Sequence, residues 1–233
     1  MDAKQIAYMT IEEFEALPED ARFELIDGVL YPLYDTSESN NCPVSRSQAC
    51  EWRTSKAAQP SSRGSSNAQA APAAVSAQGN WADTKPIRIH QELVMSLSAK
   101  IFNHINAKKG DCRVYPAPFG VRLSETTVVE PDITVVCDKD KLTDKGCTGA
   151  PDWIIEIVSP SNPAHDYLEK CGLYLNTGVR EYWIVDPKYR QITVYNEETP
   201  YIPHSFTFED TVKVSIYDDL AINFPEIMEQ IEL

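Results

Sequence analysis

The feature that most constrains the fold of this chain is a short apolar run, Trp153–Val158, with one carboxylate, Glu156, near its centre. Its length and its β-branched residues are typical of a strand buried on both faces of a sheet. An ionised carboxylate in such a strand is unfavourable unless it is paired or binds a metal ion. The run therefore predicts a sheet-containing domain whose core strand carries a functional acid.

A second carboxylate, Asp132, opens another apolar strand, predicted over Pro131–Val136. Neither strand carries a basic residue that could pair with these acids. Because side chains alternate between the faces of a strand, Asp132 and Glu156 point into one cleft if the two strands are neighbours. Hard divalent cations prefer oxygen ligands, and one or two carboxylates with water are enough. The pair predicts a Mg²⁺ site, in which Mn²⁺ would substitute, that supports metal-assisted hydrolysis.

Composition limits the class of protein. The 233 residues suffice for one substantial domain. A formal net charge of −14 argues against a protein that coats nucleic acid passively, which would be basic. No apolar run approaches the length of a membrane span and no leader opens the chain, so we expect a cytoplasmic protein without membrane contact. The six cysteines form no Cys-x-x-Cys pair, and we expect buried free thiols rather than disulfides or a zinc site.

The order of predicted elements indicates an α/β domain with a mixed central sheet flanked by helices. A capping box at Thr10–Glu13 predicts a short helix to about Leu17. Asp27-Gly28, between two apolar runs, predicts a hairpin. The remaining elements are a helix with apolar residues from His90 to Ile105, a helix over Pro163–Thr177, and a hairpin of strands 181–185 and 191–195.

Residues 35–85 differ sharply from the rest, because they contain no Leu, Ile, Phe, Met or Tyr. Such a segment buries too little apolar surface to offset the entropy of ordering it. We expect a disordered insertion within a single domain spanning residues 1–233. The alternative is a partner-binding segment anchored by Trp52 and Trp81.

Six short motifs follow one another along the chain: Glu24–Gly28, His90, Pro131-Asp132, Glu156–Ser161, Lys170 and Gly178–Trp183. In this order they resemble the Uma-type family of restriction endonucleases, within the PD-(D/E)XK nuclease superfamily. The resemblance covers nearly the whole chain outside residues 35–85. It implies a restriction-endonuclease-like fold and Mg²⁺-dependent cleavage of DNA.

The chain departs from the superfamily pattern at Val158, where a lysine is expected two residues after the strand carboxylate. The resemblance to the narrower family implies that this lysine has moved to the next helix, as Lys170. Its role would be to orient the attacking water and to stabilise charge at the phosphate. The resemblance further implies that Glu24 contacts the metal or the water. Asp132, Glu156, Lys170 and Glu24 are thus the candidate catalytic residues.

Each candidate also has a purely structural interpretation. Glu156 could be the buried partner of an arginine such as Arg122. Lys170 could be a solvated helix lysine, and Glu24 a surface residue of a hairpin. His90 fits a core histidine near a helix start as well as a ligand, so its role stays open.

Three functions remain in competition. The first is a Mg²⁺-dependent DNA endonuclease, for which we expect a homodimer because cutting both strands needs two active sites. The second is a degenerate nuclease-fold module that binds a partner or nucleic acid without cutting, which the net charge and the missing lysine favour. The third, a glycosidase with a carboxylate pair, has little support from the predicted elements.

Overall fold

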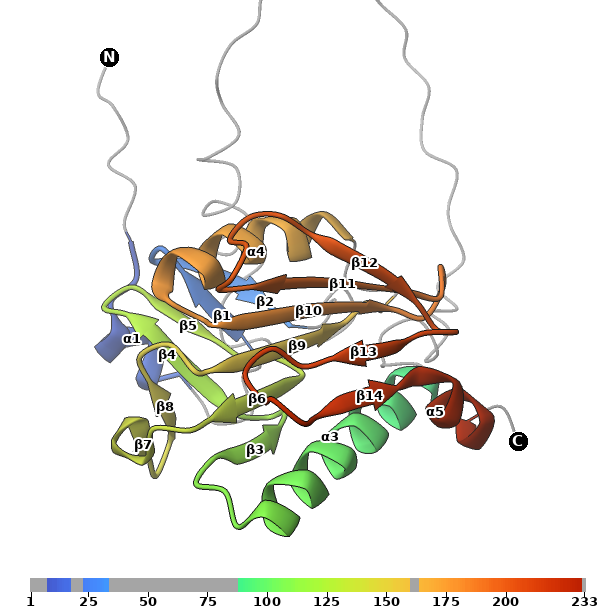
Figure 1. Cartoon of the computed structure of the whole chain (residues 1–233). Helices are drawn as coiled ribbons and strands as arrows, with labels where there is room; N and C mark the ends of the chain where they lie inside the picture. The colour runs from blue at the N-terminus through green and yellow to red at the C-terminus, as the bar shows by residue number, and fades with distance from the viewer. Residues whose placement is uncertain (1–7, 18–22, 34–87, 160–163, 232–233) are drawn as a thin grey trace, which may run out of the picture.

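The computed structural model describes residues 8–17, 23–33, 88–159 and 164–231 (Figure 1). The insertion predicted at residues 35–85 lies outside the described residues. Two six-stranded sheets dominate the fold. In the first sheet the order is β2-β1-β5-β4-β8-β7 and in the second β12-β11-β10-β9-β6-β3; β13 and β14 form a separate pair.

The strands of the first sheet are β1 (Phe23–Ile26), β2 (Val29–Pro32), β4 (Gly120–Ser124), β5 (Thr127–Val129), β7 (Leu142–Thr143) and β8 (Gly146–Thr148). Those of the second are β3 (Arg113–Pro116), β6 (Ile133–Val136), β9 (Trp153–Ile157), β10 (Glu181–Asp186), β11 (Gln191–Asn196) and β12 (His204–Thr207). The remaining elements are β13 (Thr211–Lys213), β14 (Ala221–Asn223), the helices α1 (Ile11–Glu15), α3 (Arg88–Lys108), α4 (Ala164–Thr177) and α5 (Phe224–Ile231), and the 3-10 turn η2 (Lys139–Lys141).

Both sheets are mixed, since β9 pairs in parallel with β10 and β4 in parallel with β8, while their other pairs are antiparallel. Helices α3 and α5 lie on one side of the second sheet and α4 on the other (Figure 1). The predicted α/β class with mixed sheets flanked by helices is confirmed. We expected one central sheet, whereas the structure has two, and the N-terminal hairpin of β1 and β2 belongs to the first sheet.

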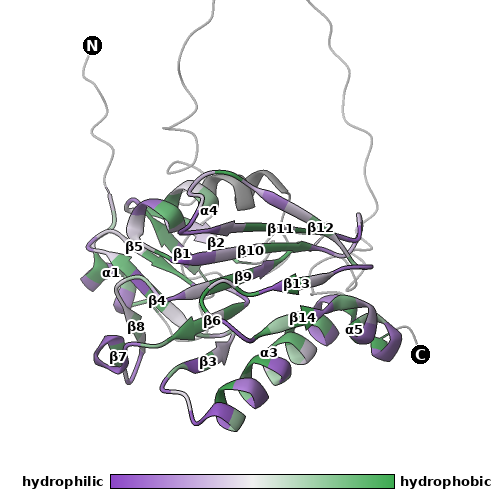
Figure 2. Cartoon of the chain, in the orientation of Figure 1, coloured by the Kyte–Doolittle hydropathy of each residue, from purple (hydrophilic) through white to green (hydrophobic). Residues whose placement is uncertain are grey.

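The second sheet separates two apolar cores. Trp153, Ile155 and Ile157 of β9 pack in the core that includes α3, whereas Ile154 packs in the core that includes α4 and the first sheet. Figure 2 shows hydrophobic residues along the strands and a mixture of hydrophobic and hydrophilic residues around α3. Because side chains alternate along β9, Glu156 lies on the face of Ile154, toward α4 and the first sheet.

Local sequence signals predicted the N-terminal elements. Thr10 Oγ1 accepts a hydrogen bond from Glu13 N at 3.2 Å, and Glu13 Oε2 accepts one from Thr10 N at 2.8 Å, which completes the capping box. The helix ends at Glu15, earlier than expected. In the hairpin, Asp27 and Gly28 have φ of 50° and 74°, the left-handed backbone that a two-residue turn of this kind requires.

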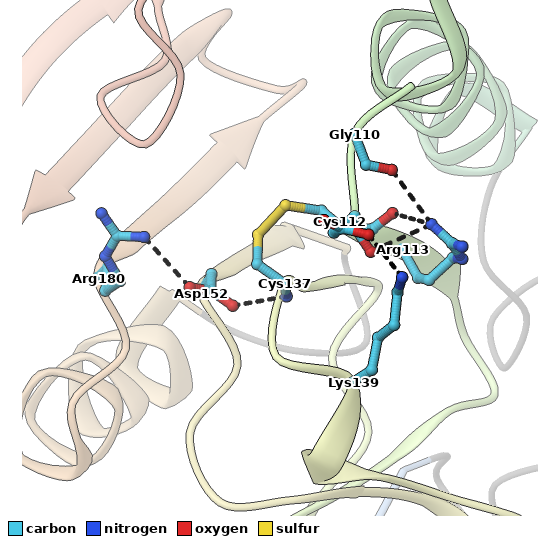
Figure 3. The surroundings of a disulfide bond; sticks show 8 residues. Gly110, Cys112, Arg113, Cys137, Lys139, Asp152 and Arg180 are labelled. Atoms are coloured by element: carbon cyan, nitrogen blue, oxygen red, sulfur yellow. Dashed lines mark hydrogen bonds and ion pairs between the residues drawn. A yellow bond between two sulfur atoms is a disulfide. The ribbon is translucent and has the colours of Figure 1, made fainter. Parts of the chain in front are cut away.

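The expectation of free cysteines was wrong for one pair, since Cys112 and Cys137 form a disulfide (Figure 3). The antiparallel register of β3 and β6 pairs Arg113 with Val136, so the two cysteines that flank this pair face each other. This proximity depends on strand pairing, which the spacing of cysteines along the chain does not reveal. Cys147 and Cys171 are buried free thiols, as expected.

Figure 3 also shows the contacts around Cys137 at this end of the second sheet. Asp152 Oδ2 accepts a hydrogen bond from Cys137 N at 2.7 Å, and its Oδ1 lies 3.2 Å from Arg180 Nη1. In the described part of the chain, no helix is long and apolar enough to cross a membrane.

Candidate active site

Asp132 and Glu156 lie at one end of the strands of the second sheet, where β6 begins and β9 ends. The antiparallel register pairs Ile133 with Ile155, so one step further along it Asp132 faces Glu156. The side chain of Asp132 is 20% exposed, and its Oδ2 accepts a hydrogen bond from Ile157 N at 2.7 Å. The structure thus brings the two predicted ligands together on neighbouring strands, with Asp132 at the rim and Glu156 buried.

Lys170 reaches this end of the sheet from α4. Its side chain is buried, and its Nζ lies 2.8 Å from Glu24 Oε1 and 3.1 Å from Glu156 Oε1. The interpretation of Lys170 as a solvated helix lysine was therefore wrong. Burial alone would lower the pKa of this ammonium, but Glu156 and Glu24 outweigh burial and raise the pKa above its ordinary value. Lys170 is a charged group fixed between two carboxylates.

Glu24 comes from the first sheet, on β1, and is buried rather than exposed on a hairpin surface. Its Oε1 accepts hydrogen bonds from Lys170 Nζ and, at 3.0 Å, from Glu130 N. Glu130 lies two residues before Asp132 in the chain, so Glu24 also supports the segment that enters β6. The site therefore draws on both sheets and on α4.

Glu156 has a second partner, Tyr174, whose hydroxyl donates to Oε1 at 2.9 Å. Burial raises the pKa of Glu156, as do Asp132 and Glu24, while Lys170 opposes this shift. Burial likewise raises the pKa of Tyr174 well above its ordinary value, so the phenol stays a neutral donor. The proposed partner Arg122 lies elsewhere, since its Nη2 pairs with Glu125 at 2.7 Å.

His90, near the start of α3, supports Asp132 from the other core. Its Nε2 lies 3.2 Å from Asp132 Oδ2, and among the described residues its buried Nδ1 has no hydrogen-bond partner. Burial lowers the pKa of His90, but the contact with Asp132 outweighs this and raises the pKa. The sequence left the role of His90 open, and the structure places it against the rim carboxylate.

The three carboxylates share one property. Among the described residues, Glu24 and Glu156 each accept hydrogen bonds only at Oε1, and Asp132 only at Oδ2. Each acid is thus held in place through one oxygen, while its other oxygen accepts no hydrogen bond from the described part of the chain.

These oxygens are the hard donors that Mg²⁺ prefers. In the part of the chain that the structure describes, no group of three or more His, Cys, Asp or Glu is arranged to hold a metal ion. The available set is therefore the carboxylate pair Asp132 and Glu156 completed by water, which suits Mg²⁺ because this ion keeps several waters. The residues fit the predicted ion.

Sequence reasoning missed part of this cluster. The sequence did not identify Tyr174 as a site residue, and nothing in its spacing distinguishes a tyrosine that donates to an acid from one that only packs. The distance of four residues between Lys170 and Tyr174 is the one available signal, since it places them on adjacent turns of the same helix face.

Comparisons with known proteins agree with this architecture. A model of the Uma2 family, described as "Putative restriction endonuclease", matches residues 75–224. An uncharacterized protein of Synechocystis sp. is 28% identical over 111 residues, which are 46% of this chain and 57% of that relative. The chain thus aligns with little more than half the length of this curated relative.

A solved structure from Anabaena variabilis, described as a "putative nuclease belonging to DUF820", shares the fold with a TM-score of 0.61. It is 17% identical and the match covers 96% of this chain and 99% of that chain, so the likeness concerns the fold alone. The family match extends over most of the chain, including α3, Asp132, Glu156 and Lys170. The chain belongs to the Uma2 family.

Proposed function

We propose that this protein is a Mg²⁺-dependent DNA endonuclease that hydrolyses phosphodiester bonds at the end of the second sheet where β6 begins and β9 ends. The observation that carries the proposal is the arrangement of Asp132 and Glu156, each anchored through one oxygen, beside the buried ammonium of Lys170. Two adjacent hard ligands and a cation form the minimum set for charge stabilisation at a phosphate.

Asp132 and Glu156 would hold the ion, which when bound lowers the pKa of a water and offsets negative charge on the phosphoryl group. Lys170 would orient the attacking water and stabilise charge in the transition state. Glu24 and Tyr174 fix the ammonium and the buried carboxylate in place. His90 orients Asp132 through their contact.

The test is cleavage of supercoiled plasmid DNA with Mg²⁺ or Mn²⁺. We expect nicking or linearisation by the wild type and none by Asp132→Asn, because the substitution removes a charged ligand but keeps the shape of the side chain. Asp140→Asn, an exposed acid in the 3-10 turn, is the matched control and should cut like the wild type. Equal cleavage by Asp132→Asn would refute the proposed site.

One observation favours a second candidate, a binding module that does not cut. Lys170 already pairs with both Glu24 and Glu156, so each of these buried carboxylates has a cationic partner without a metal ion. The net charge of −14 points the same way. A wild type that binds DNA but neither cuts it nor gains thermal stability from Mn²⁺ would favour this module.

Cutting both strands of a duplex requires two such sites, so a cytoplasmic homodimer is the working form that we propose. Sedimentation of the purified protein would test it, and a monomer at all concentrations would limit the enzyme to nicking single strands.

A further inference from the structure

The turn that joins β10 to β11 carries three consecutive exposed side chains, Lys188, Tyr189 and Arg190. Tyr189 is 68% exposed, although most of its side chain is an apolar ring. Asp186 Oδ1 accepts hydrogen bonds from Lys188 N at 2.9 Å and Tyr189 N at 3.1 Å, so the backbone of the turn is fixed. The fold therefore presents these side chains to solvent from a defined position.

The turn follows the C-terminal end of β10, which lies beside the C-terminal end of β9 (Figure 1), where Glu156 is located. Strands β9 and β10 are parallel, and their register pairs Glu156 with Ile184. Lys188 comes four residues after Ile184, which corresponds to at most about 13 Å along the strand direction. This distance is about that of a few nucleotide steps along a DNA strand.

Both cations of the turn are exposed, and the guanidinium of Arg190 also lies over the ring of Phe208, 5.5 Å from its centre. Lys188 Nζ lies 5.0 Å from the centre of the Tyr189 ring and forms no ion pair with the described residues. Arg190 pairs with Glu209 at 3.1 Å, and both side chains are exposed. Exposed ion pairs of this kind contribute little, whereas a guanidinium and a phosphate form a strong charge-assisted contact.

We propose that Lys188, Tyr189 and Arg190 form a DNA contact that holds the strand a few nucleotides from the cleaved bond. This inference rests on the proposed function, because the active site at the same end of the second sheet is the reason for DNA to lie there. Lys188 and Arg190 neutralise phosphates, and Tyr189 stacks on a base or packs on a sugar. In a chain of net charge −14, such a local contact supplies the attraction that the whole surface does not.

The test is fluorescence anisotropy with a labelled duplex of mixed sequence, in EDTA so that nothing is cut. The double variant Lys188→Gln, Arg190→Gln should bind about tenfold more weakly, and its slope of log affinity against log salt should fall by about 1.8, the value for two lost phosphate contacts. Tyr189→Ala should weaken binding with an unchanged slope. Thermal melting checks that each variant is folded.

The matched control is Lys108→Gln, Lys109→Gln at the far end of α3, about 27 Å along the helix from His90. This pair also contains one exposed lysine with an acidic partner, Asp219. It should bind like the wild type. Glu209→Gln supplies a test of opposite sign, because it releases Arg190 from its acidic partner and should tighten binding.

The outcomes separate the contact from the proposed function. Binding that the turn variants leave unchanged overturns the contact, even if the wild type cleaves plasmid. A wild type that binds no duplex overturns it as well. Binding that weakens as expected supports the contact, even if the wild type never cuts, and in that case only the proposed hydrolysis fails.

Discussion

Glu156 of β9 and Glu181 of β10 are both buried on neighbouring strands of the second sheet, but their hydrogen bonds differ. Glu181 begins β10 and lies beside Trp153 at the opposite end of β9 from Glu156. Both oxygens of Glu181 are occupied: Oε1 accepts from Trp183 Nε1 at 2.7 Å, and Oε2 accepts from Ser215 N, Ser215 Oγ and Ile216 N at 2.8, 2.8 and 3.0 Å. Among the described residues, Glu156 accepts hydrogen bonds at Oε1 alone.

This difference distinguishes a buried acid that protein donors satisfy completely from a buried acid that is a candidate ligand. Glu181 ties the segment after β13 to the sheet, and its neutral donors satisfy it without any cation among the described residues. Glu156 lies beside a cation and other acids and keeps an oxygen uncommitted, an arrangement that stability alone does not require. A buried carboxylate whose two oxygens both accept hydrogen bonds fits a structural role. A buried carboxylate in a charged cluster with one oxygen uncommitted is a candidate ligand.

The largest effect is expected from Lys170→Met. It leaves Glu24 and Glu156 buried without their cation, which should lower the free energy of unfolding by about 4 kcal/mol and abolish cleavage. Urea unfolding measures this, with the exposed Lys145→Met as control. Full stability of Lys170→Met would show that the ion pairs of Lys170 with Glu24 and Glu156 do not stabilise the fold.

Glu181→Ala should destabilise by about 3 kcal/mol, because Trp183 Nε1 and two backbone N–H groups lose their acceptor. Any fraction that folds should keep the response of the wild type to Mn²⁺, since Glu181 has no part in the ion site. Urea unfolding and a Mn²⁺ thermal titration of the same variant separate the two properties. Loss of the Mn²⁺ response in folded Glu181→Ala would erase the contrast between the two acids.

Glu156→Gln should show the converse. The stabilisation of the wild type by Mn²⁺ amounts to about 2.7 kcal/mol at a hundredfold excess over the dissociation constant, and the variant should lose it. Stability without metal should change little, because Lys170 keeps Glu24 as a partner. Asp132→Asn should lose the same response, whereas Asp140→Asn should retain it. A normal Mn²⁺ shift in Glu156→Gln would exclude this carboxylate as a ligand.

Tyr174→Phe should cost about 1.5 kcal/mol, because one hydrogen bond to the buried Glu156 is lost. The matched control is Tyr201→Phe, which removes the exposed hydroxyl that donates to Asn176 at 2.6 Å, and should change stability much less. Urea unfolding measures both. Equal effects would mean that burial does not strengthen the contact with Glu156.

The pH dependence of stability gives the smallest effect. Burial raises the pKa of Glu181 above its ordinary value, against the opposing influence of its hydrogen bonds. The folded state therefore holds this proton more tightly than the unfolded state, so stability falls as pH rises from the ordinary pKa of 4.5 through the raised value. Relative to Glu181→Gln, the wild type should lose stability over that range in urea unfolding at stepped pH. A parallel course of both proteins would contradict the shift.

The local elements could be predicted from the sequence alone. The Thr10 capping box and the Asp27-Gly28 turn depend on residues within a few positions, and the length of α3 follows from the spacing of Leu93, Leu97, Ile101 and Ile105 on one face. It also placed two acids on core strands, because an acid within an apolar run is visible without any knowledge of neighbours. These features require only short-range physics.

Only the tertiary structure decided which groups meet. Glu24 and Lys170 are separated by 146 positions, and Cys112 and Cys137 by 25, so their contacts depend on how strands pair and how α4 crosses the sheets. The division into two sheets follows from the same long-range pairing. A residue's composition and spacing are local, whereas burial and hydrogen-bond saturation are properties of the packed chain, and these decided that Glu181 is structural and Glu156 a candidate ligand.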